Sequence, residues 1–223
     1  MKIFRVPKRI RAILFDMDST LYTNAEYARA QSDLPIERLA RLKGKSFDEM
    51  NAEIAAYRKK WARENDGRNI SLANVFVDFG ISIEESVKWR NELLWPENYL
   101  AKDAQLRSAL ERLAQSFVLA VVTNNPMCLA ERTLDALGAA DMFRAVVGLD
   151  TCGVSKPHEA PFMKAAALCG AKLEECVSAG DRYDIDIALP LELGMGGILV
   201  NGAEDVYTLP ELLAKGDDSG CQD

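Results

Sequence analysis

The chain has 223 residues, of which 48% are hydrophobic and 27% are charged, and its formal net charge is −7. This length suffices for one substantial hydrophobic core with a smaller module attached. The acidic balance argues against non-specific nucleic-acid binding and against a polybasic membrane anchor. No apolar run approaches the roughly 18 residues that a membrane-spanning helix needs.

The N-terminus is basic but lacks the apolar middle of a signal peptide, because charges recur up to Arg11. The five cysteines include no C-x-x-C pair, which indicates free thiols rather than disulfides or a zinc site. We therefore expect a cytoplasmic protein without a membrane segment.

The first predicted strand is Ala12–Phe15, an apolar run that ends in two aspartates, Asp16 and Asp18. Neighbouring carboxylates repel each other, and burying them costs several kcal/mol unless they are paired or bind a metal. A stretch that departs from local rules in this way is a candidate functional site.

Residues 23–98 carry helix signals and almost no strand signal. Ser46 with Glu49 forms a capping-box pattern, and Ser82 with Glu85 repeats it. Residues 42–46 are expected to join two helices and are a candidate substrate contact. An apolar stripe at helical spacing should form the core of this insert. The stripe consists of Phe47, Met50, Ile54, Tyr57 and Trp61.

The rest of the chain alternates strands with helices. Further strands are predicted at 117–122, 145–147, 177–179 and 197–200, with helices near 102–115, 127–137, 158–169 and 184–193. Gly138 is expected to end the second of these helices. The pattern predicts an α/β fold with a mostly parallel sheet covered on both faces. Residues 1–22 and 99–223 should form this core, 23–98 a helical module, and 215–223 a disordered tail.

Four polar elements follow the ends of four predicted strands. Ligands bind at the carboxyl edge of an open parallel sheet, so we expect these elements to converge there. Crowded carboxylates favour a hard divalent cation, most simply Mg²⁺. A lysine and uncharged donors beside such an ion suit a phosphoryl group. The elements are Asp16-Met17-Asp18-Ser19-Thr20, Thr123-Asn124-Asn125, Lys156-Pro157, and Gly180-Asp181 with Asp186.

The segments "DMDST", "VVTNN", "SKP" and "AGDRYDID" resemble, in this order, the four motifs of the haloacid dehalogenase superfamily. The resemblance implies a Rossmann-like core with strand order 5-4-1-2-3 and an α-helical cap inserted after the first motif. It also implies an aspartyl-phosphate intermediate and Mg²⁺ as cofactor. Dehalogenases of this superfamily lack the second aspartate of the first motif, so the presence of Asp18 favours phosphoryl transfer.

The resemblance assigns a role to each motif position. Asp16 is the expected nucleophile and a metal ligand, while Asp18 is the general acid/base and offers its backbone carbonyl to the metal. The remaining roles are phosphoryl binding by Thr123, Asn124 and Lys156, metal binding by Asp181, and support by Thr20 and Asp186.

The sequence thus predicts a magnesium-dependent phosphatase that hydrolyses a small phosphomonoester. A phosphosugar mutase of the β-phosphoglucomutase type uses the same core residues and stays open as an alternative. A non-catalytic signalling receiver fits less well, because it carries its phosphoacceptor well downstream of the acidic pair. His158, the single histidine, is interpreted as an exposed residue at a helix start rather than as a base. The substrate and the oligomeric state cannot be read from the sequence.

Overall fold

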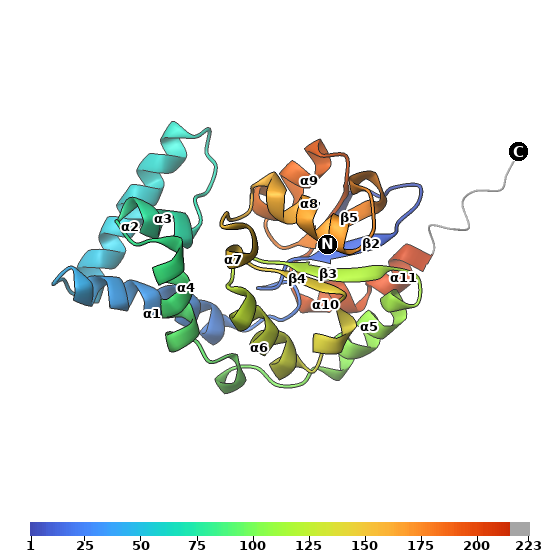
Figure 1. The fold of residues 1–223 in the computed structure, drawn as a ribbon, viewed down its shortest axis with the longest axis horizontal. Coiled ribbons are helices and arrows are strands. Elements are labelled where there is room, and N and C mark those ends of the chain that lie inside the picture. Colours follow the sequence, from blue (N-terminus) through green and yellow to red (C-terminus); the bar gives the residue numbers. More distant parts are fainter. Residues whose placement is uncertain (215–223) are drawn as a thin grey trace, which may run out of the picture.

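The computed structural model describes residues 1–214 and contains a six-stranded sheet in the order β1-β6-β5-β2-β3-β4 (Figure 1). The strands are β1 Lys2–Arg5, β2 Ala12–Phe15, β3 Val118–Val122, β4 Ala145–Val147, β5 Cys176–Gly180 and β6 Gly196–Leu199. All neighbouring pairs are parallel except β1 with β6. Without β1, the order is the predicted 5-4-1-2-3, and the predicted α/β fold class is confirmed.

Strand β1 was not predicted. Its sequence, Lys-Ile-Phe-Arg, carries two charges and is mostly exposed, because the strand lies at the edge of the sheet and pairs on one side only. Short, charged edge strands protect a sheet from pairing with other chains. The alternation of polar and apolar residues in such a strand is too short to be recognised within a basic N-terminal segment.

Strand β2 lies in the middle of the sheet and is buried on both faces. Phe15 pairs with Val121 of β3 and with Ala179 of β5. The residues that follow these three strands therefore leave the sheet at the same level and along the same edge.

Helices cover both faces of the sheet, which explains the continuous apolar strands. On one face lie α5 Ala104–Ala114, α6 Met127–Leu137, α10 Ala203–Tyr207 and α11 Leu209–Ala214. On the other lie α8 Glu159–Leu168 and α9 Ala188–Glu192. The short helix α7 Leu149–Cys152 follows β4.

The ends of the core helices agree with the sequence signals, with one exception. Gly138 ends α6 in the left-handed conformation, as predicted (φ 69°). His158 is exposed and is the N-cap of α8, where its Nδ1 accepts a hydrogen bond from the Ala160 N–H. The predicted helix over 184–193 is instead a π-helical turn, Tyr183–Ile187, followed by α9.

Between β2 and β3 the chain forms α1 Ala25–Leu42, α2 Phe47–Glu64, α3 Leu72–Asp78 and α4 Ile83–Leu93, followed by the 3₁₀ turn Pro96–Asn98. We call residues 23–98 the insert. Its helices pack around an apolar cluster of their own, separate from the two clusters that flank the sheet. In Figure 1 the insert lies to one side of the sheet and its covering helices.

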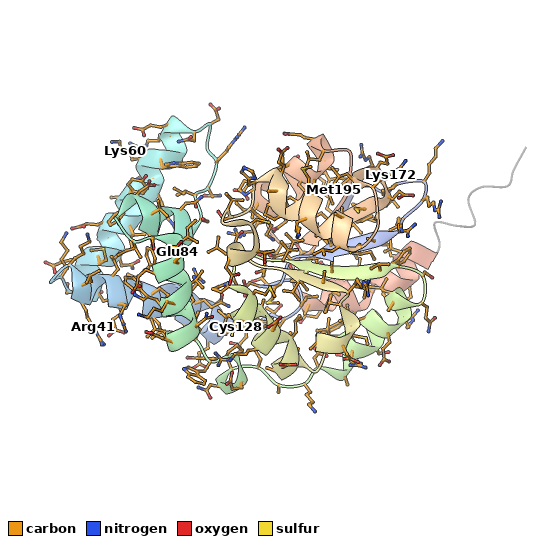
Figure 2. All side chains as sticks on the ribbon, viewed as in Figure 1. Arg41, Lys60, Glu84, Cys128, Lys172 and Met195 are labelled. Atoms are coloured by element: carbon orange, nitrogen blue, oxygen red, sulfur yellow. The ribbon has the colours of Figure 1, made fainter. Side chains whose placement is uncertain are left out.

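Four of the five residues of the predicted stripe on α2 face this cluster, whereas Trp61, near the end of the helix, is not part of it. Met50 and Ile54 are buried in it, while Phe47 and Tyr57 pack against its rim. Arg41 and Lys60 lie on the outer surface of the insert (Figure 2). This division between an apolar and a charged face is what the helical spacing predicted.

The two capping patterns differ in outcome. The Ser46 pattern forms both hydrogen bonds of a capping box at the start of α2. In the second pattern, Ser82 accepts from the Glu85 N–H, but the Glu85 carboxylate accepts from the Trp89 indole at 2.5 Å. The Glu85 carboxylate thus bonds the buried indole of Trp89 instead of the backbone N–H of Ser82, which would complete a capping box.

The two segments that connect the insert to the sheet domain lie side by side. The Asn24 amide, which also caps α1, donates to the backbone carbonyl of Tyr99 at 2.8 Å. The rings of Tyr27 and Tyr99 stack with their centroids 5.2 Å apart. The chain therefore leaves the sheet domain and returns to it at one place.

None of the helices in the described residues is long and apolar enough to cross a membrane. The four cysteines in residues 1–214 are free, as expected. Cys221 and the predicted disordered tail, 215–223, lie outside the described residues.

Candidate active site

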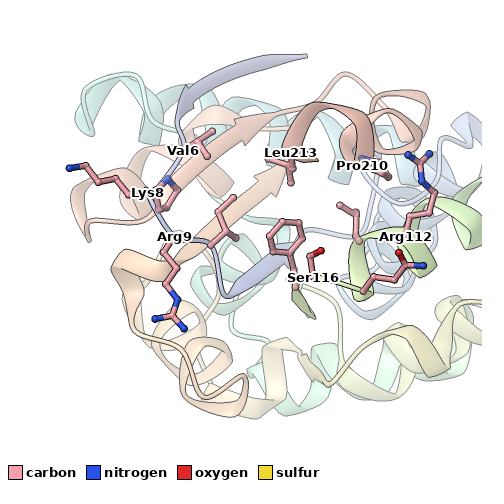
Figure 3. Close-up of a pocket in the computed structure, with 12 residues that line it drawn as sticks. Val6, Lys8, Arg9, Arg112, Ser116, Pro210 and Leu213 are labelled. Carbon is pink, nitrogen blue, oxygen red and sulfur yellow. The ribbon is translucent and has the colours of Figure 1, made fainter. Parts of the chain in front are cut away.

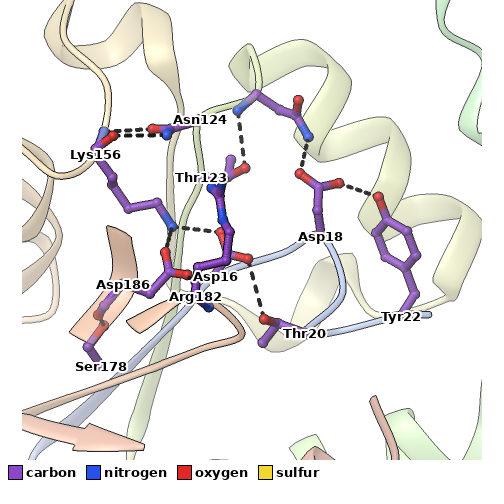
Figure 4. A network of polar contacts seen from close by, with 11 residues as sticks. Asp16, Asp18, Thr20, Tyr22, Thr123, Asn124, Lys156, Ser178, Arg182 and Asp186 are labelled. Carbon is purple, nitrogen blue, oxygen red and sulfur yellow. Dashed lines mark hydrogen bonds and ion pairs between the residues drawn. The ribbon is translucent and has the colours of Figure 1, made fainter. Parts of the chain in front are cut away.

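Lys156 joins two of the predicted acidic residues at the carboxyl edge of the sheet (Figure 4). Its Nζ lies 2.6 Å from Asp16 Oδ1 and 2.6 Å from Asp186 Oδ1. The lysine side chain is 1% exposed. Burial lowers the pKa of Lys156, but the charges of Asp16 and Asp186 outweigh this effect and keep it above the ordinary value.

Asp16 is held from both sides. Its N–H donates to the Ala179 carbonyl at 2.8 Å, which extends the β2–β5 ladder by one residue. The hydroxyl of Thr20 donates to Asp16 Oδ2 at 3.3 Å. Ser19 has a positive φ of 59°, so the loop turns back through a left-handed residue. That conformation costs a serine about 1–2 kcal/mol.

Asp18 accepts hydrogen bonds from three side chains. The Asn125 amide donates to Oδ2 at 2.8 Å, and the Gln31 amide donates to Oδ1 at 2.8 Å. The Tyr22 hydroxyl also donates to Oδ1. Burial, followed by the charge of Asp16, raises the pKa of Asp18. Burial of this kind favours the protonated form of a carboxyl group.

Asn124 and Thr123 shape the loop after β3. The Asn124 side chain accepts from the Lys156 N–H at 2.7 Å and donates to the Lys156 carbonyl at 3.1 Å, which ties the second and third motifs together. Thr123 is buried, and its hydroxyl accepts from the Asn125 N–H at 3.1 Å. Asn124 lines the cleft described below, whereas Thr123 is not among its lining residues.

Asp181 and Asp186 lie beside Asp16. One carboxylate oxygen from each of these three residues lies within 4.8 Å of the others, a spacing that suits a shared cation. Burial, followed by the charges of Asp16 and Asp186, raises the pKa of Asp181 to about 7. A hard divalent cation bound among these carboxylates would relieve their mutual repulsion. The Asp18 carboxylate is not part of this cluster.

Asp186, which the sequence predicted to support the site, lies within the carboxylate cluster and contacts Lys156. The π-helical turn buries it, and its Oδ2 accepts from the Arg182 N–H at 3.1 Å. A Cβ atom at Gly180 would lie 2.4 Å from the Asp186 Cβ. The glycine at the end of β5 is therefore needed for this packing.

A cleft of about 320 Å³ opens between the sheet edge and the insert. Polar side chains line it from both sides. From the sheet domain come Asp16, Asp18, Asn124, Asn125, Asp181 and Arg182, and from the insert come Gln31, Ser32, Arg58, Ser71 and Arg90.

The residues of the insert were missed by sequence reasoning, as was Tyr22. Residues 42–46, the predicted candidate contact, join α1 to α2 as expected but are not among the cleft residues. Instead the segment before α3 touches the sheet domain. Asn69 donates to Asp184 at 2.8 Å, and the hydroxyls of Ser71 and Ser155 lie 3.2 Å apart.

A second, larger hollow of about 450 Å³ lies where Ile10 and Phe117 lead into β2 and β3 (Figure 3). This is the amino edge of the sheet, opposite the acidic cluster. None of the 12 residues that line it is a carboxylate. The cleft, rather than this hollow, therefore holds the predicted site residues Asp16, Asp18, Asn124 and Asp181.

Residues 10–193 match the family profile described as haloacid dehalogenase-like hydrolase. The chain belongs to the haloacid dehalogenase-like hydrolases. This confirms the resemblance drawn from the four motifs, and the protein is an enzyme of the hydrolase class.

Two curated relatives and one solved structure indicate how far the likeness to this family extends. The chain is 26% identical to 5-amino-6-(5-phospho-D-ribitylamino)uracil phosphatase YigB of Escherichia coli, over 95% of this chain and 88% of the relative. It is 30% identical to a phosphoglycolate phosphatase of Xanthomonas campestris, over 84% of this chain and 81% of the relative. A HAD phosphatase of Thermococcus onnurineus superposes with a TM-score of 0.65 at 21% identity, over 92% of this chain and 98% of the other.

Proposed function

We propose that this hydrolase is a magnesium-dependent phosphatase that hydrolyses a small phosphomonoester through an aspartyl-phosphate at Asp16. One observation carries the proposal. A buried lysine fixes Asp16 beside a three-carboxylate cluster, and a protonatable carboxyl, Asp18, lies two residues further on. The printed functions of the two curated relatives, both phosphatases, support it.

In the first half-reaction, a carboxylate oxygen of Asp16 attacks phosphorus as the ester oxygen leaves. Asp18 gives that oxygen its proton, so the leaving group departs as a neutral alcohol. Lys156, Asn124 and Thr123 bind the phosphoryl oxygens. In the second half-reaction, Asp18 takes a proton from water, which attacks phosphorus, releases phosphate and restores the Asp16 carboxylate.

The cluster fits a magnesium ion, because its donors are three carboxylate oxygens from rigid parts of the sheet edge. Asp16, Asp181 and the backbone carbonyl of Asp18 would hold the ion, with Asp186 beside them. Bound there, it would lower the repulsion between the Asp16 carboxylate and an incoming phosphate.

In this proposal the insert, residues 23–98, is the cap that closes over the phosphomonoester, and residues 1–22 with 99–223 are the catalytic domain. The free thiols suit a reducing compartment, so we place the enzyme in the cytoplasm.

The test is phosphate release from a panel of phosphomonoesters by metal-free protein, with and without added Mg²⁺. We expect hydrolysis of several small esters only when Mg²⁺ is present. Full activity after rigorous chelation would refute the metal assignment. Rapid interconversion of sugar 1- and 6-phosphates with little phosphate release would favour the mutase, which shares Asp16 but must exclude water.

A further inference from the structure

One buried cation in the cleft has no role in the chemistry described above. Arg90 of α4 is 7% exposed and lines the cleft. Its Nη1 donates to the side-chain oxygen of Asn125 at 3.1 Å, and its Nε has no hydrogen-bond partner. Within residues 1–214 it forms no ion pair with a carboxylate. A buried guanidinium with an unsatisfied donor is costly in an unliganded protein.

Two more arginines line the same cleft. Arg58 of the insert forms no ion pair with a carboxylate in the described chain, whereas Arg182 of the sheet domain lies among the aspartates of the site, whose charges raise its pKa. Burial, followed by the nearby charge of Arg182, lowers the pKa of Arg58. Like charges from two parts of the molecule therefore face one another at the cleft.

Several arginines elsewhere on the molecule form ion pairs with carboxylates. Arg107 bonds Asp141, Arg132 bonds Glu97, and Arg41 bonds Glu37, all at the surface. Arg90 differs from these surface arginines because it is buried and its Nε has no hydrogen-bond partner.

A purely structural role for Arg90 accounts for only one of its donors. The hydrogen bond to Asn125 positions the amide that donates to Asp18, but one neutral donor would suffice for that. The planar fork of an arginine matches an oxyanion, which it can bind through two parallel hydrogen bonds.

We propose that Arg90, assisted by Arg58, binds a second oxyanion carried by the leaving group, so that the substrate is a phosphomonoester with a carboxylate or a second phosphate. This inference rests on the proposed phosphatase function. The cleft of about 320 Å³ has room for both the transferred phosphoryl group and the leaving group.

Four two-carbon esters test the inference, because they differ mainly in the charge at the far end. They are phosphoglycolate, ethylene glycol bisphosphate, ethylene glycol monophosphate and phosphoethanolamine. We expect the wild-type kcat/KM to be highest for one or both of the first two. A preference for phosphoglycolate identifies the oxyanion as a carboxylate, and a preference for the bisphosphate identifies it as a phosphate.

The variants are Arg90→Gln and, as a matched control on the same helix, Lys88→Gln, which removes an exposed charge. Arg90→Gln should lower kcat/KM for the preferred oxyanion ester about 10- to 100-fold more than for ethylene glycol monophosphate, mainly through KM. Arg90→Lys should restore part of the loss, and Lys88→Gln should change none of the ratios.

The inference is overturned if the wild-type enzyme hydrolyses the four esters equally, or if Arg90→Gln lowers all of them by the same factor. Should Arg90→Gln not fold, Arg58→Gln decides, because its loss must still reduce the preference. Absence of phosphate release from every ester by the wild-type protein would instead contradict the proposed function itself.

Discussion

The two walls of the cleft differ in charge and in origin. The sheet-domain wall presents Asp16, Asp18 and Asp181, all at strand ends. The insert wall presents Arg58 and Arg90, both from helix faces. The difference teaches that, under the functions proposed above, bond making depends on the sheet and substrate choice on the helices. Variants on the two walls should therefore fail in different ways.

The largest expected effect lies at the nucleophile. Asp16→Asn preserves shape but replaces the attacking oxygen, so kcat should fall about 10⁴-fold or more with Mg²⁺ present. Asp33→Asn, an exposed aspartate of the insert, is the control and should retain wild-type turnover. Retention of more than a few per cent of activity by Asp16→Asn would show that the intermediate does not form there.

The next effect concerns the proton. Asp18→Asn should lower turnover by about 10²- to 10⁴-fold, because both half-reactions lose their acid or base. The loss should be smaller for an aryl phosphate, whose leaving group needs less protonation, than for an alkyl phosphate. Equal losses of turnover for both esters would mean that Asp18 has a structural role and does not transfer the proton.

A third prediction concerns stability. Lys156→Met leaves two buried carboxylates, Asp16 and Asp186, without their cation, which should cost about 3–5 kcal/mol of unfolding free energy at pH 7. Removal of the lysine charge raises the pKa of Asp186 further in the folded variant, so the loss should shrink as the pH falls toward 5 and this carboxyl takes up a proton.

Urea unfolding at pH 7 and pH 5 measures this, with Lys164→Met, an exposed lysine of α8, as the control. A loss of stability that is the same at both pH values would show that packing, rather than charge, holds the lysine.

A smaller effect is the pH dependence of metal binding. The pKa of Asp181 is raised to about 7 in the folded protein, so its carboxyl is largely protonated below that pH and cannot serve as a ligand. Mg²⁺ affinity should therefore rise with pH from 6 to 8, by at most about tenfold per pH unit.

The sign for stability is opposite in the metal-free protein. The folded pKa of Asp181 lies above the unfolded value, so the native state binds more protons, and stability should fall as the pH rises from about 4 to above 7. Calorimetric titration and thermal unfolding at three pH values check both trends. A flat Mg²⁺ affinity across this range would contradict the assignment of Asp181.

The smallest effect lies in the insert. Ser46→Ala removes one half of the α2 capping box and should cost about 1 kcal/mol. Hydrogen exchange should become faster in the insert helices and not in the sheet. The control Ser108→Ala, at an exposed position of α5, should leave exchange in both regions unchanged. Faster exchange throughout the protein would mean that insert and sheet domain unfold as one unit.

The sheet-domain wall could be predicted from sequence because strand ends converge whatever their separation. Lys156 and Asp16 lie 140 positions apart, yet the parallel sheet brings them into contact. The insert wall could not be predicted, because Gln31 and Arg90 stand on helices whose orientation depends on packing. No local pattern distinguishes them from other polar helix residues. The edge strand β1 and the π-helical turn were not predicted for a similar reason, since both depend on neighbours distant in sequence.

The hydrogen bond between Asn24 and Tyr99 places both junctions of the helical insert side by side. Because the chain leaves and rejoins the sheet domain at one place, exchanging the segment for another requires two junctions and leaves the strand register untouched. A chimaera that carries a relative's helices would keep the aspartates and lysine of the sheet edge in place. New selectivity could then arise by recombination, without any change to the residues that handle phosphorus.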